Sequence, residues 1–321
     1  MAPRRARRLG FAVKVLGKPG LKSHDARRWQ SGPSLGVSIE ALHAIFDYLA
    51  AAGISMYRLS SDFVPYSTHP DLPQFHGQIE RHARELEGLA ARARELDLRL
   101  SLHPSQYVVL NAADPQVMRK SIADLDVQAQ LLDALRQGPE GVVVLHVGGL
   151  YGDRRAALDR FGEGFRQLSE SARRRLVIEN DESCFTVEDC VELHERLGTP
   201  VIFDHQHHRL NPGSLDLFTA ARRALATWPA GVRPKVHFSS PRLDGREVQR
   251  GKKVVLEAPL LRQHADYVDP WTFADFLDGV RDVDFDVMLE AKAKDLALLR
   301  LKDDLERIGR AEGLLAPLLS Y

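Results

Sequence analysis

Eight short runs of apolar and β-branched residues recur along the chain, and longer helical patterns separate most of them. The runs are 8–15, 55–60, 98–103, 141–147, 175–180, 200–205, 234–239 and 286–291. Alternation of strand and helix is typical of a parallel sheet, because each crossover between parallel strands usually contains a helix. Eight such units predict an α/β fold, a single TIM (β/α)8 barrel, with its site at the carboxyl ends of the strands.

The segments between the strand runs carry helix signals. In 38–53 apolar residues recur every three or four positions, with Ser38 as the expected N-cap and Gly53 as the stop. Another long helix is expected to open at Asp114 and Pro115. The rival fold is a doubly wound open sheet. It is disfavoured because no GxGxxG turn follows the first strand run.

The chain length suits one barrel. We expect a flexible basic tail over residues 1–7 and a single barrel domain over residues 8–321. The apolar run near the N-terminus is too short for a signal peptide or a membrane span. Cys184 and Cys190 are not spaced as CxxC, which favours a reducing compartment. We therefore expect a cytoplasmic protein, associated with the nucleoid when it acts.

The chain has no overall basic field, since 44 Lys and Arg balance 44 Asp and Glu. Binding to nucleic acid would need a local patch. Two segments without clear helix are locally basic. Segment 16–37 carries Lys18, Lys22, Arg27, Arg28 and Trp29, and segment 239–263 carries Arg242, Arg246, Arg250, Lys252, Lys253 and Arg262. In a barrel both lie at the end of the candidate site, where DNA phosphates are the expected partners and a solvated loop is the alternative.

Six of the eight strand runs deliver a histidine or a carboxylate to the same rim. These residues are His103, His146, Glu179, Asp204, His237 and Glu290, and the loops just after strands add His69, His207 and His264. One such histidine is usually a satisfied core residue, but six converging groups would be costly to bury without counter-charge. Divalent ions remove that cost, and mixed nitrogen and oxygen ligands suit Zn or Mn. The number of ligands predicts two or three ions.

The same residues occur in phrases that resemble the UV damage endonuclease family, in order over about 55–295. The phrases are YRLSSDFVPYSTHP, LSLHPSQYVVLN, VLHVGGLYGD, LVIENDE, DHQHHRLNP, KVHFSSPR, HADYV and MLEAKAKD. The resemblance implies a TIM-barrel nuclease similar to endonuclease IV. Such an enzyme nicks duplex DNA immediately 5′ to a UV photoproduct with metal-activated water and leaves a 3′-hydroxyl and a 5′-phosphate. It also implies manganese as the metal, with Zn, Mg or Co as alternatives.

The resemblance further implies which residues bind each ion. His103, His146 and Glu179 would hold the first, while Glu179, Asp204, His237 and Glu290 would hold the second. His207 and His264 would hold a third. His69 would lie near the scissile phosphate, and Lys235 would act beside the metals. Whether Lys235 is chemically modified or is a plain lysine paired with carboxylates stays open.

Lesion recognition is implied for Gln106 and Tyr107, which would wedge into the duplex where the damaged bases leave the stack. The alternative is that Tyr107 covers the barrel mouth. One departure concerns the first strand, where Phe11 and Val15 stand at positions that are often Tyr and Asn in the family. Phe11 is expected beside the lesion, so the range of lesions is in doubt.

Two other functions compete with this one. A divalent-metal sugar or sugar-phosphate isomerase would use the same barrel and similar ligands, but it would not need the basic segments. A DNA-damage binding protein without activity is disfavoured, because every ligand position that can be aligned is intact. Abasic sites remain possible substrates of the nuclease. We expect double-stranded DNA with UV lesions as the partner, no membrane, no organic cofactor and a monomer.

Overall fold

The strands of the chain form a closed ring of parallel neighbours. The computed structural model describes residues 6–312. The strands are β1 (Leu9–Ala12), β2 (Met56–Arg58), β3 (Arg99–Ser101), β4 (Val143–His146), β5 (Leu176–Glu179), β6 (Val201–Asp204), β7 (Lys235–Phe238) and β10 (Asp286–Leu289). They pair in the order β3-β2-β1-β10-β7-β6-β5-β4, and a parallel bridge between Leu102 and Val143 closes the ring. The predicted TIM barrel is confirmed, and each strand lies within its predicted run.

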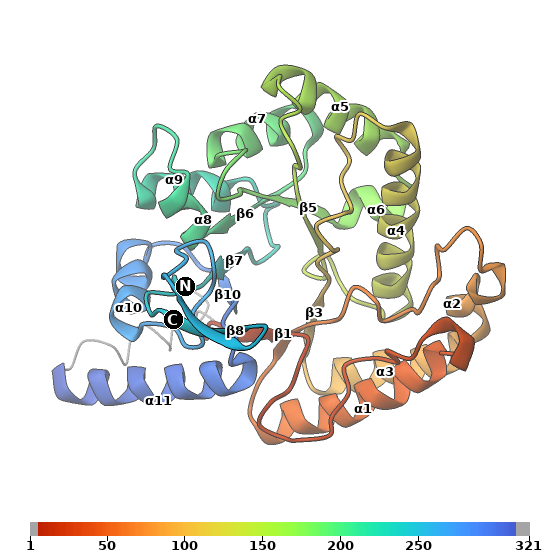
Figure 1. Ribbon diagram of the computed structural model, residues 1–321, viewed down its shortest axis with the longest axis horizontal. Helices are drawn as coiled ribbons and strands as arrows, with labels where there is room; N and C mark the ends of the chain where they lie inside the picture. The colour runs from red at the N-terminus through yellow and green to blue at the C-terminus, as the bar shows by residue number, and fades with distance from the viewer. Residues whose placement is uncertain (1–5, 313–321) are drawn as a thin grey trace.

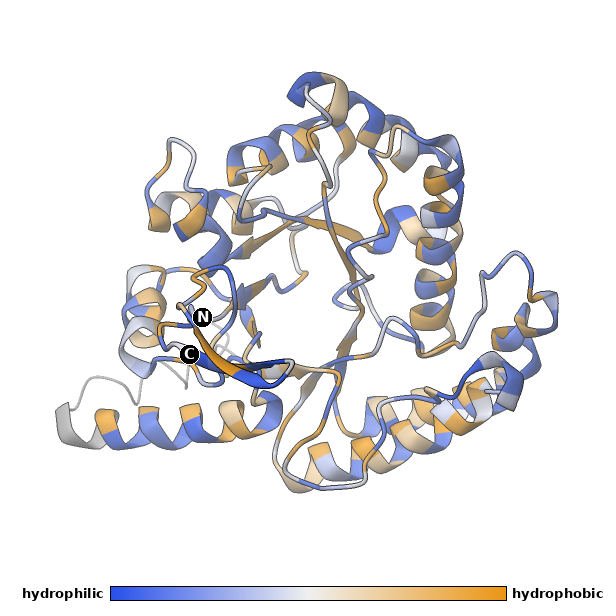
Figure 2. Ribbon diagram, in the orientation of Figure 1, coloured by the Kyte–Doolittle hydropathy of each residue, from blue (hydrophilic) through white to orange (hydrophobic). Residues whose placement is uncertain are grey.

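Helices surround this ring on the outside (Figure 1). They are α1 (Leu35–Ala51), α2 (Gln78–Arg81), α3 (Ala83–Glu95), α4 (Pro115–Ala134), α5 (Arg154–Gln167), α6 (Glu170–Arg175), α7 (Val187–Leu197), α8 (His205–Leu210), α9 (Leu217–Ala226), α10 (Pro270–Gly279) and α11 (Lys294–Glu312). Figure 2 shows apolar colour along the strands and on part of each helix, as burial of one helix face requires. Within the described residues, no helix is long and apolar enough to cross a membrane.

The helix starts agree with the sequence at one place and differ at another. Asp114 caps α4 by accepting from the Gln116 amide, as predicted. Helix α1 begins earlier than predicted, because Ser34 rather than Ser38 is its N-cap. Ser38 is fully buried, and its hydroxyl accepts from the Asp25 amide. That bond connects the loop before α1 to the helix. Ser38 therefore makes a side-chain contact with the backbone, but within the helix and not at its start.

Two segments differ from the sequence expectation. Residues 1–5 of the expected tail lie outside the described residues, but Arg7 is buried, with its guanidinium over the Phe285 ring and donating to the Val283 carbonyl. Arg7 is therefore packed on the barrel and is not part of a flexible tail. Within 239–270, where no helix was predicted, β8 (Arg246–Arg250) and β9 (Lys253–Glu257) form an antiparallel hairpin.

The amino end of the barrel is closed by a buried ion cluster around Asp286, the first residue of β10. Its carboxylate accepts from Arg99 Nη1 at 2.8 Å and lies 3.1 Å from Arg233 Nε. The Arg8 amide also donates to it at 3.0 Å. Burial lowers the pKa of Arg99. The cluster lies at the opposite end of the strands from their carboxyl ends. It therefore stabilises the barrel without taking part in the candidate site.

Replacing Asp286 should test this stabilising role. Asp286→Asn keeps the shape but leaves the buried Arg99 guanidinium without its counter-ion, so we expect a loss of about 3–5 kcal/mol in the free energy of unfolding. Urea denaturation followed by circular dichroism measures it. The matched control is Asp278→Asn, which breaks an exposed pair with Arg281 and should cost less than about 1 kcal/mol. Equal effects of the two variants would contradict a stabilising role for the buried cluster.

Candidate metal centre

The strand register brings the predicted ligands side by side. His146 pairs with Glu179 across β4 and β5, and Asp204 pairs with His237 across β6 and β7. Each of these residues lies at or near the carboxyl end of its strand. In-register parallel neighbours have their Cα atoms about 5 Å apart, so their side chains on the inner face must meet. The site therefore follows from the way the barrel closes.

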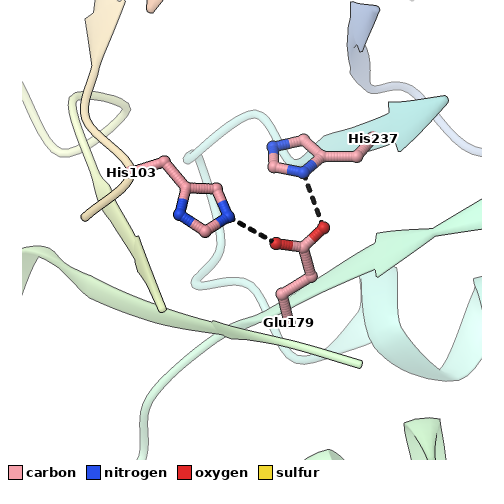
Figure 3. A group of neighbouring side chains, drawn as sticks. All are labelled: His103, Glu179 and His237. Atoms are coloured by element: carbon pink, nitrogen blue, oxygen red, sulfur yellow. Dashed lines mark hydrogen bonds and ion pairs between the residues drawn. The ribbon is translucent and has the colours of Figure 1, made fainter. Parts of the chain in front are cut away.

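Glu179 is the centre of the cluster, and its side chain is fully buried. One carboxylate oxygen lies 3.0 Å from His103 Nε2 and 3.6 Å from His146 Nε2. The other lies 2.7 Å from His237 Nδ1 and 3.8 Å from His207 Nδ1. Figure 3 shows His103 and His237 pointing at this carboxylate from two sides. Four histidines from four different elements thus converge on one acid.

Glu290 is a second meeting point, one residue after β10. Its carboxylate lies 3.3 Å from His237 Nδ1 and 3.7 Å from His264 Nε2. The Arg58 guanidinium at the end of β2 also pairs with it. Asp204 completes the cluster by lying 3.6 Å from His207 Nδ1. All eight predicted ligands are therefore linked through the acids Glu179, Asp204 and Glu290.

The ligand atoms gather into three compact groups, each within 4.8 Å. The groups are His103, Glu179 and His237; His146, Glu179 and His207; and Asp204, His237 and Glu290. The resemblance predicted another division, with His103 and His146 together and with His207 beside His264. Sharing of Glu179 and of His237 between groups is the reason that several divisions are compatible with one cluster.

Unsatisfied buried atoms indicate that the cluster suits cations. Asp204 Oδ2 and His237 Nε2 are buried without a hydrogen-bond partner among the described residues. His103 Nδ1 faces the Pro104 carbonyl at 3.1 Å, and a carbonyl can only accept, so this nitrogen is the donor. Its Nε2 is then free to bind a metal. A separation of 3.0 Å from Glu179 fits two atoms that are each about 2 Å from one ion.

The charges of the cluster favour cations as well. Burial raises the pKa of Glu179, but His237 and His146 outweigh it and hold that pKa well below its usual range. Burial raises the pKa of Glu290, while Arg58 and His237 lower it well below its usual value. Burial lowers the pKa of His103 to about 4, so its imidazole is neutral near pH 7. Ionised carboxylates and a neutral imidazole are the forms in which these groups bind metals.

Asp204 and His207 differ from these groups, because the pKa of each is raised. Burial raises the pKa of Asp204, and the neighbouring Glu179 charge raises it further. Burial lowers the pKa of His207, but Asp204 and Glu179 raise it to about 9. Near pH 7 His207 is therefore protonated in a site crowded with negative charge, and its Nδ1 donates to the Asn180 carbonyl. A divalent ion can replace that proton as the counter-charge.

Lys235 lies inside the barrel, two residues before His237, and is fully buried. Its Nζ atom has no hydrogen-bond partner, and no ion pair of Lys235 occurs among the described residues. Burial, followed by the Arg99 and Arg58 charges, lowers its pKa well below the usual value. The amine is therefore not paired with a carboxylate, which was one of the two expectations for it.

The remaining predicted residues lie outside the cluster. Tyr107 is 78% exposed and Gln106 is exposed beside it on the loop after β3. Arg242, Lys252 and Lys253 lie on the segment that contains the hairpin, with Lys252 and Lys253 exposed and Arg242 half-buried.

Phe11 does not lie where it was expected, and His69 lies apart from the cluster. Phe11 is fully buried against the Tyr57 ring, with centroids 5.4 Å apart, and so offers no surface to DNA. His69 has no contact with the cluster in the described residues; its ring lies near Tyr66, and it lines a cavity of about 650 Å³ beside α4. The loop after β2 is long enough to carry His69 away from the barrel axis.

Sequence reasoning missed two residues that support the cluster, Arg58 and Asn180, and the helical position of His207. Arg58 ends β2 at the same rim, but only histidines and acids were considered there. The Asn180 amide bonds to both the amide and the carbonyl of Asp204, and the Asn180 carbonyl accepts from His207 Nδ1 at 3.0 Å. Asp204 also caps α8 by accepting from the His207 amide at 2.7 Å. His207 was expected on a loop and lies instead in the first turn of this helix.

Comparison with known proteins agrees with this geometry. The UV-endonuclease UvdE family matches residues 35–317. UV DNA damage endonucleases of Bacillus velezensis and Bacillus pumilus are 35% and 34% identical, over 85% and 79% of this chain and 82% and 76% of theirs. The crystal structure of SacUVDE is 30% identical and superposes with a TM-score of 0.79, covering 94% of this chain and 99% of that one.

A more distant likeness shows the fold alone. A crystal structure of D-psicose 3-epimerase is 13% identical with a TM-score of 0.57, over 96% of this chain and 99% of that one. An identity this low carries no information about the substrate. The comparison therefore supports the barrel fold and does not support a sugar isomerase activity. The match over most of the length identifies the chain as a member of the UV-endonuclease UvdE family, a family of DNA repair endonucleases.

Proposed function

We propose that this chain nicks duplex DNA immediately 5′ to UV photoproducts and leaves a 3′-hydroxyl and a 5′-phosphate. The observation that carries the proposal is the convergence of five imidazoles on the three neighbouring acids Glu179, Asp204 and Glu290. Two or three divalent ions, with Mn²⁺ as the first candidate, would supply Lewis acidity for phosphodiester hydrolysis. Abasic sites and other distortions are further substrates under this proposal.

The chain's own residues have separate roles in the proposal. Glu179 holds His237 in a fixed arrangement, the Pro104 carbonyl orients His103, and Arg58 fixes Glu290. Asn180 orients both Asp204 and His207 through the backbone. Ligands that are hydrogen-bonded to neighbouring residues keep their orientation when a cation binds or dissociates. The buried Lys235 amine, whose pKa is lowered by burial, lies beneath the ligands in the barrel without a hydrogen-bond partner among the described residues and is available to be modified.

Contacts with DNA are proposed for the rim. The exposed Gln106 and Tyr107 are suited to fill the space that a flipped lesion vacates, and the exposure of Tyr107 argues against its covering the barrel mouth. His69 remains a candidate for a phosphate contact from the loop after β2. Arg242, Lys252 and Lys253 are candidates for contacts with the backbone phosphates. Phe11 has no direct role in this arrangement.

Incision of a labelled duplex with one defined photoproduct tests the proposal. With Mn²⁺ we expect one cut immediately 5′ to the lesion, none in the undamaged duplex, and none with EDTA. Glu179→Gln should lower the rate by about a hundredfold or more, because the central ligand charge is lost. The control Glu192→Gln makes the same change on the surface, where Glu192 pairs with Arg155, and should cut normally. No cut at any lesion or abasic site by metal-loaded protein would refute the proposal.

Metal binding has a test that does not need activity. Protein stripped with EDTA should gain about 2.7 kcal/mol of stability when Mn²⁺ is added at a hundred times its dissociation constant. For a chain of this size the melting temperature should rise by about 4 °C. Differential scanning calorimetry measures the shift. Glu179→Gln should lose most of it, whereas Glu192→Gln should keep it, and an unchanged wild-type melting temperature would speak against a metal centre.

The basic hairpin tip gives a further prediction. Lys252→Ala/Lys253→Ala should weaken binding to damaged and undamaged duplex by similar factors, because phosphate contacts carry no sequence information. The slope of log affinity against log salt should fall by about 1–2. The control Arg173→Ala/Arg174→Ala removes the same charge from α6, at the amino end of the barrel. An equal fall in that control would mean that the effect is one of net charge alone.

A further inference from the structure

The hairpin β8–β9 is an insertion between strand β7 and His264. Its base is closed by an antiparallel bridge between Pro241 and His264, and the Ala265 amide donates to the Ser240 carbonyl at 2.8 Å. Its tip is the two-residue loop Gly251 and Lys252, and Gly251 has the positive φ of +63° that such loops require. Because His264 lies 3.7 Å from Glu290, the base of the hairpin adjoins the candidate metal centre.

The register divides the hairpin into two faces. Val254 lies opposite Gln249 and Leu256 lies opposite Glu247 on one side, which we call the apolar face. The other side, the basic face, carries the cross-strand pairs Arg246 with Glu257, Val248 with Val255, and Arg250 with Lys253. Alternation of side chains along each strand makes this division strict.

The apolar face is uncovered. Val254 is 60% exposed and Leu256 is 71% exposed, and Leu243 at the hairpin base is 68% exposed. Neither strand packs extensively on any other helix or strand in the described part of the chain. Figure 2 shows the apolar colour of β9 on this projecting element. A two-stranded hairpin alone is only marginally stable in water, and a contiguous exposed apolar patch marks a binding surface.

The charges around this face indicate what covers it. Segment 242–262 holds six cations, Arg242, Arg246, Arg250, Lys252, Lys253 and Arg262, against three acids, Asp244, Glu247 and Glu257. Glu257 is already paired with Arg250 at 2.7 Å. The tip therefore presents surplus positive charge next to apolar side chains. A second copy of this chain would bring the same charge and be repelled, whereas a polyanion would be attracted.

The dimensions of the hairpin match one part of a DNA duplex. Five-residue strands are about 17 Å long, and the major groove, about 12 Å wide, admits a two-stranded ribbon, whereas the minor groove is too narrow. Within the major groove the apolar group available to Val and Leu is the C5-methyl of thymine. Phosphates line both sides of the groove, where the surplus cations would lie.

We propose that the hairpin β8–β9 lies in the major groove of the duplex beside the lesion, with Val254 and Leu256 against thymine methyl groups and its cations toward the phosphates. The inference rests on the proposed function, because it places DNA at the carboxyl ends of the strands. It adds a surface that reads the flanking duplex, separate from the metal centre and from Gln106 and Tyr107. The enzyme would therefore prefer lesions within thymine-rich sequence.

Two exposed residues allow a test in the full-length protein. Val254→Ser/Leu256→Ser should weaken binding to a damaged, thymine-flanked duplex by about tenfold, measured by fluorescence anisotropy. Replacing the flanking thymines by deoxyuridine, which lacks the methyl group, should weaken wild-type binding by roughly threefold. The same replacement should leave the double variant unchanged. The matched control is Val255→Ser, the same change in the same strand on the basic face, which should keep the response to deoxyuridine.

The outcomes separate this inference from the proposed function. Wild-type incision with equal binding by wild type and Val254→Ser/Leu256→Ser would overturn the hairpin inference and leave the nuclease intact. A self-associating wild type that the double variant makes monomeric, with DNA affinity unchanged, would also overturn it in favour of a second copy as the occupant. Absence of incision by metal-loaded wild type would refute the proposed function itself. Unaltered thermal melting of the double variant shows that a loss of binding is not a loss of folding.

Discussion

The carboxylate of Glu179 is the interaction on which the rest of the site depends. An ionised acid with no solvent exposure is tolerated in a barrel only if nearby groups replace water, and four histidines do so here. Each of those histidines then has an imidazole in a fixed orientation at the carboxyl end of the barrel. Removing the acid would therefore disturb all four. The arrangement is stable as a cluster of coupled charges rather than as a set of independent pairs.

Barrel closure explains why such a cluster can assemble from distant parts of the chain. His103 and Glu290 are far apart in sequence, but β3 and β10 are separated only by β1 and β2 around the ring. In-register pairing of β4 with β5 and of β6 with β7 then sets the heights of His146, Glu179 and His237. A shift of one residue in any strand would turn its ligand toward the helices. The fold and the site thus impose the same register.

The barrel and most of the ligands could be predicted from the sequence, because the strand runs and the residues at their ends are both local features. Strand runs are visible in the pattern of apolar residues, and a ligand at a strand end needs only its position in the run. Partners across the barrel are not visible in this way. The pairing of Arg58 with Glu290 and the burial of Phe11 against Tyr57 depend on which strands become neighbours. The path of the long loop that carries His69 likewise depends on a tertiary contact, the bond between Thr68 and Asp124 of α4.

The hairpin was missed for a related reason. Its strands are exposed on both faces, so VVL in β9 is not part of an amphipathic pattern facing a core, and the flanking cations made the whole segment look like a solvated loop. Its glycine at 251 is the one local signal, since a two-residue turn between short β-favouring runs is typical of a hairpin. Apolar periodicity predicts a strand only where one of its faces packs on a core, and neither face of this hairpin does so within the described chain.

The barrel interior also has a polarity along its axis. Arg8, Arg99 and Arg233 surround the buried acid Asp286 at the amino end, whereas Glu179, Asp204 and Glu290 crowd the carboxyl end. Lys235 lies between these two layers and has no partner in either among the described residues. Burial is the main reason that its pKa falls well below the usual value, and the Arg99 and Arg58 charges lower it further despite the carboxylates above. Divalent ions bound to those carboxylates would lower the pKa of the amine still more.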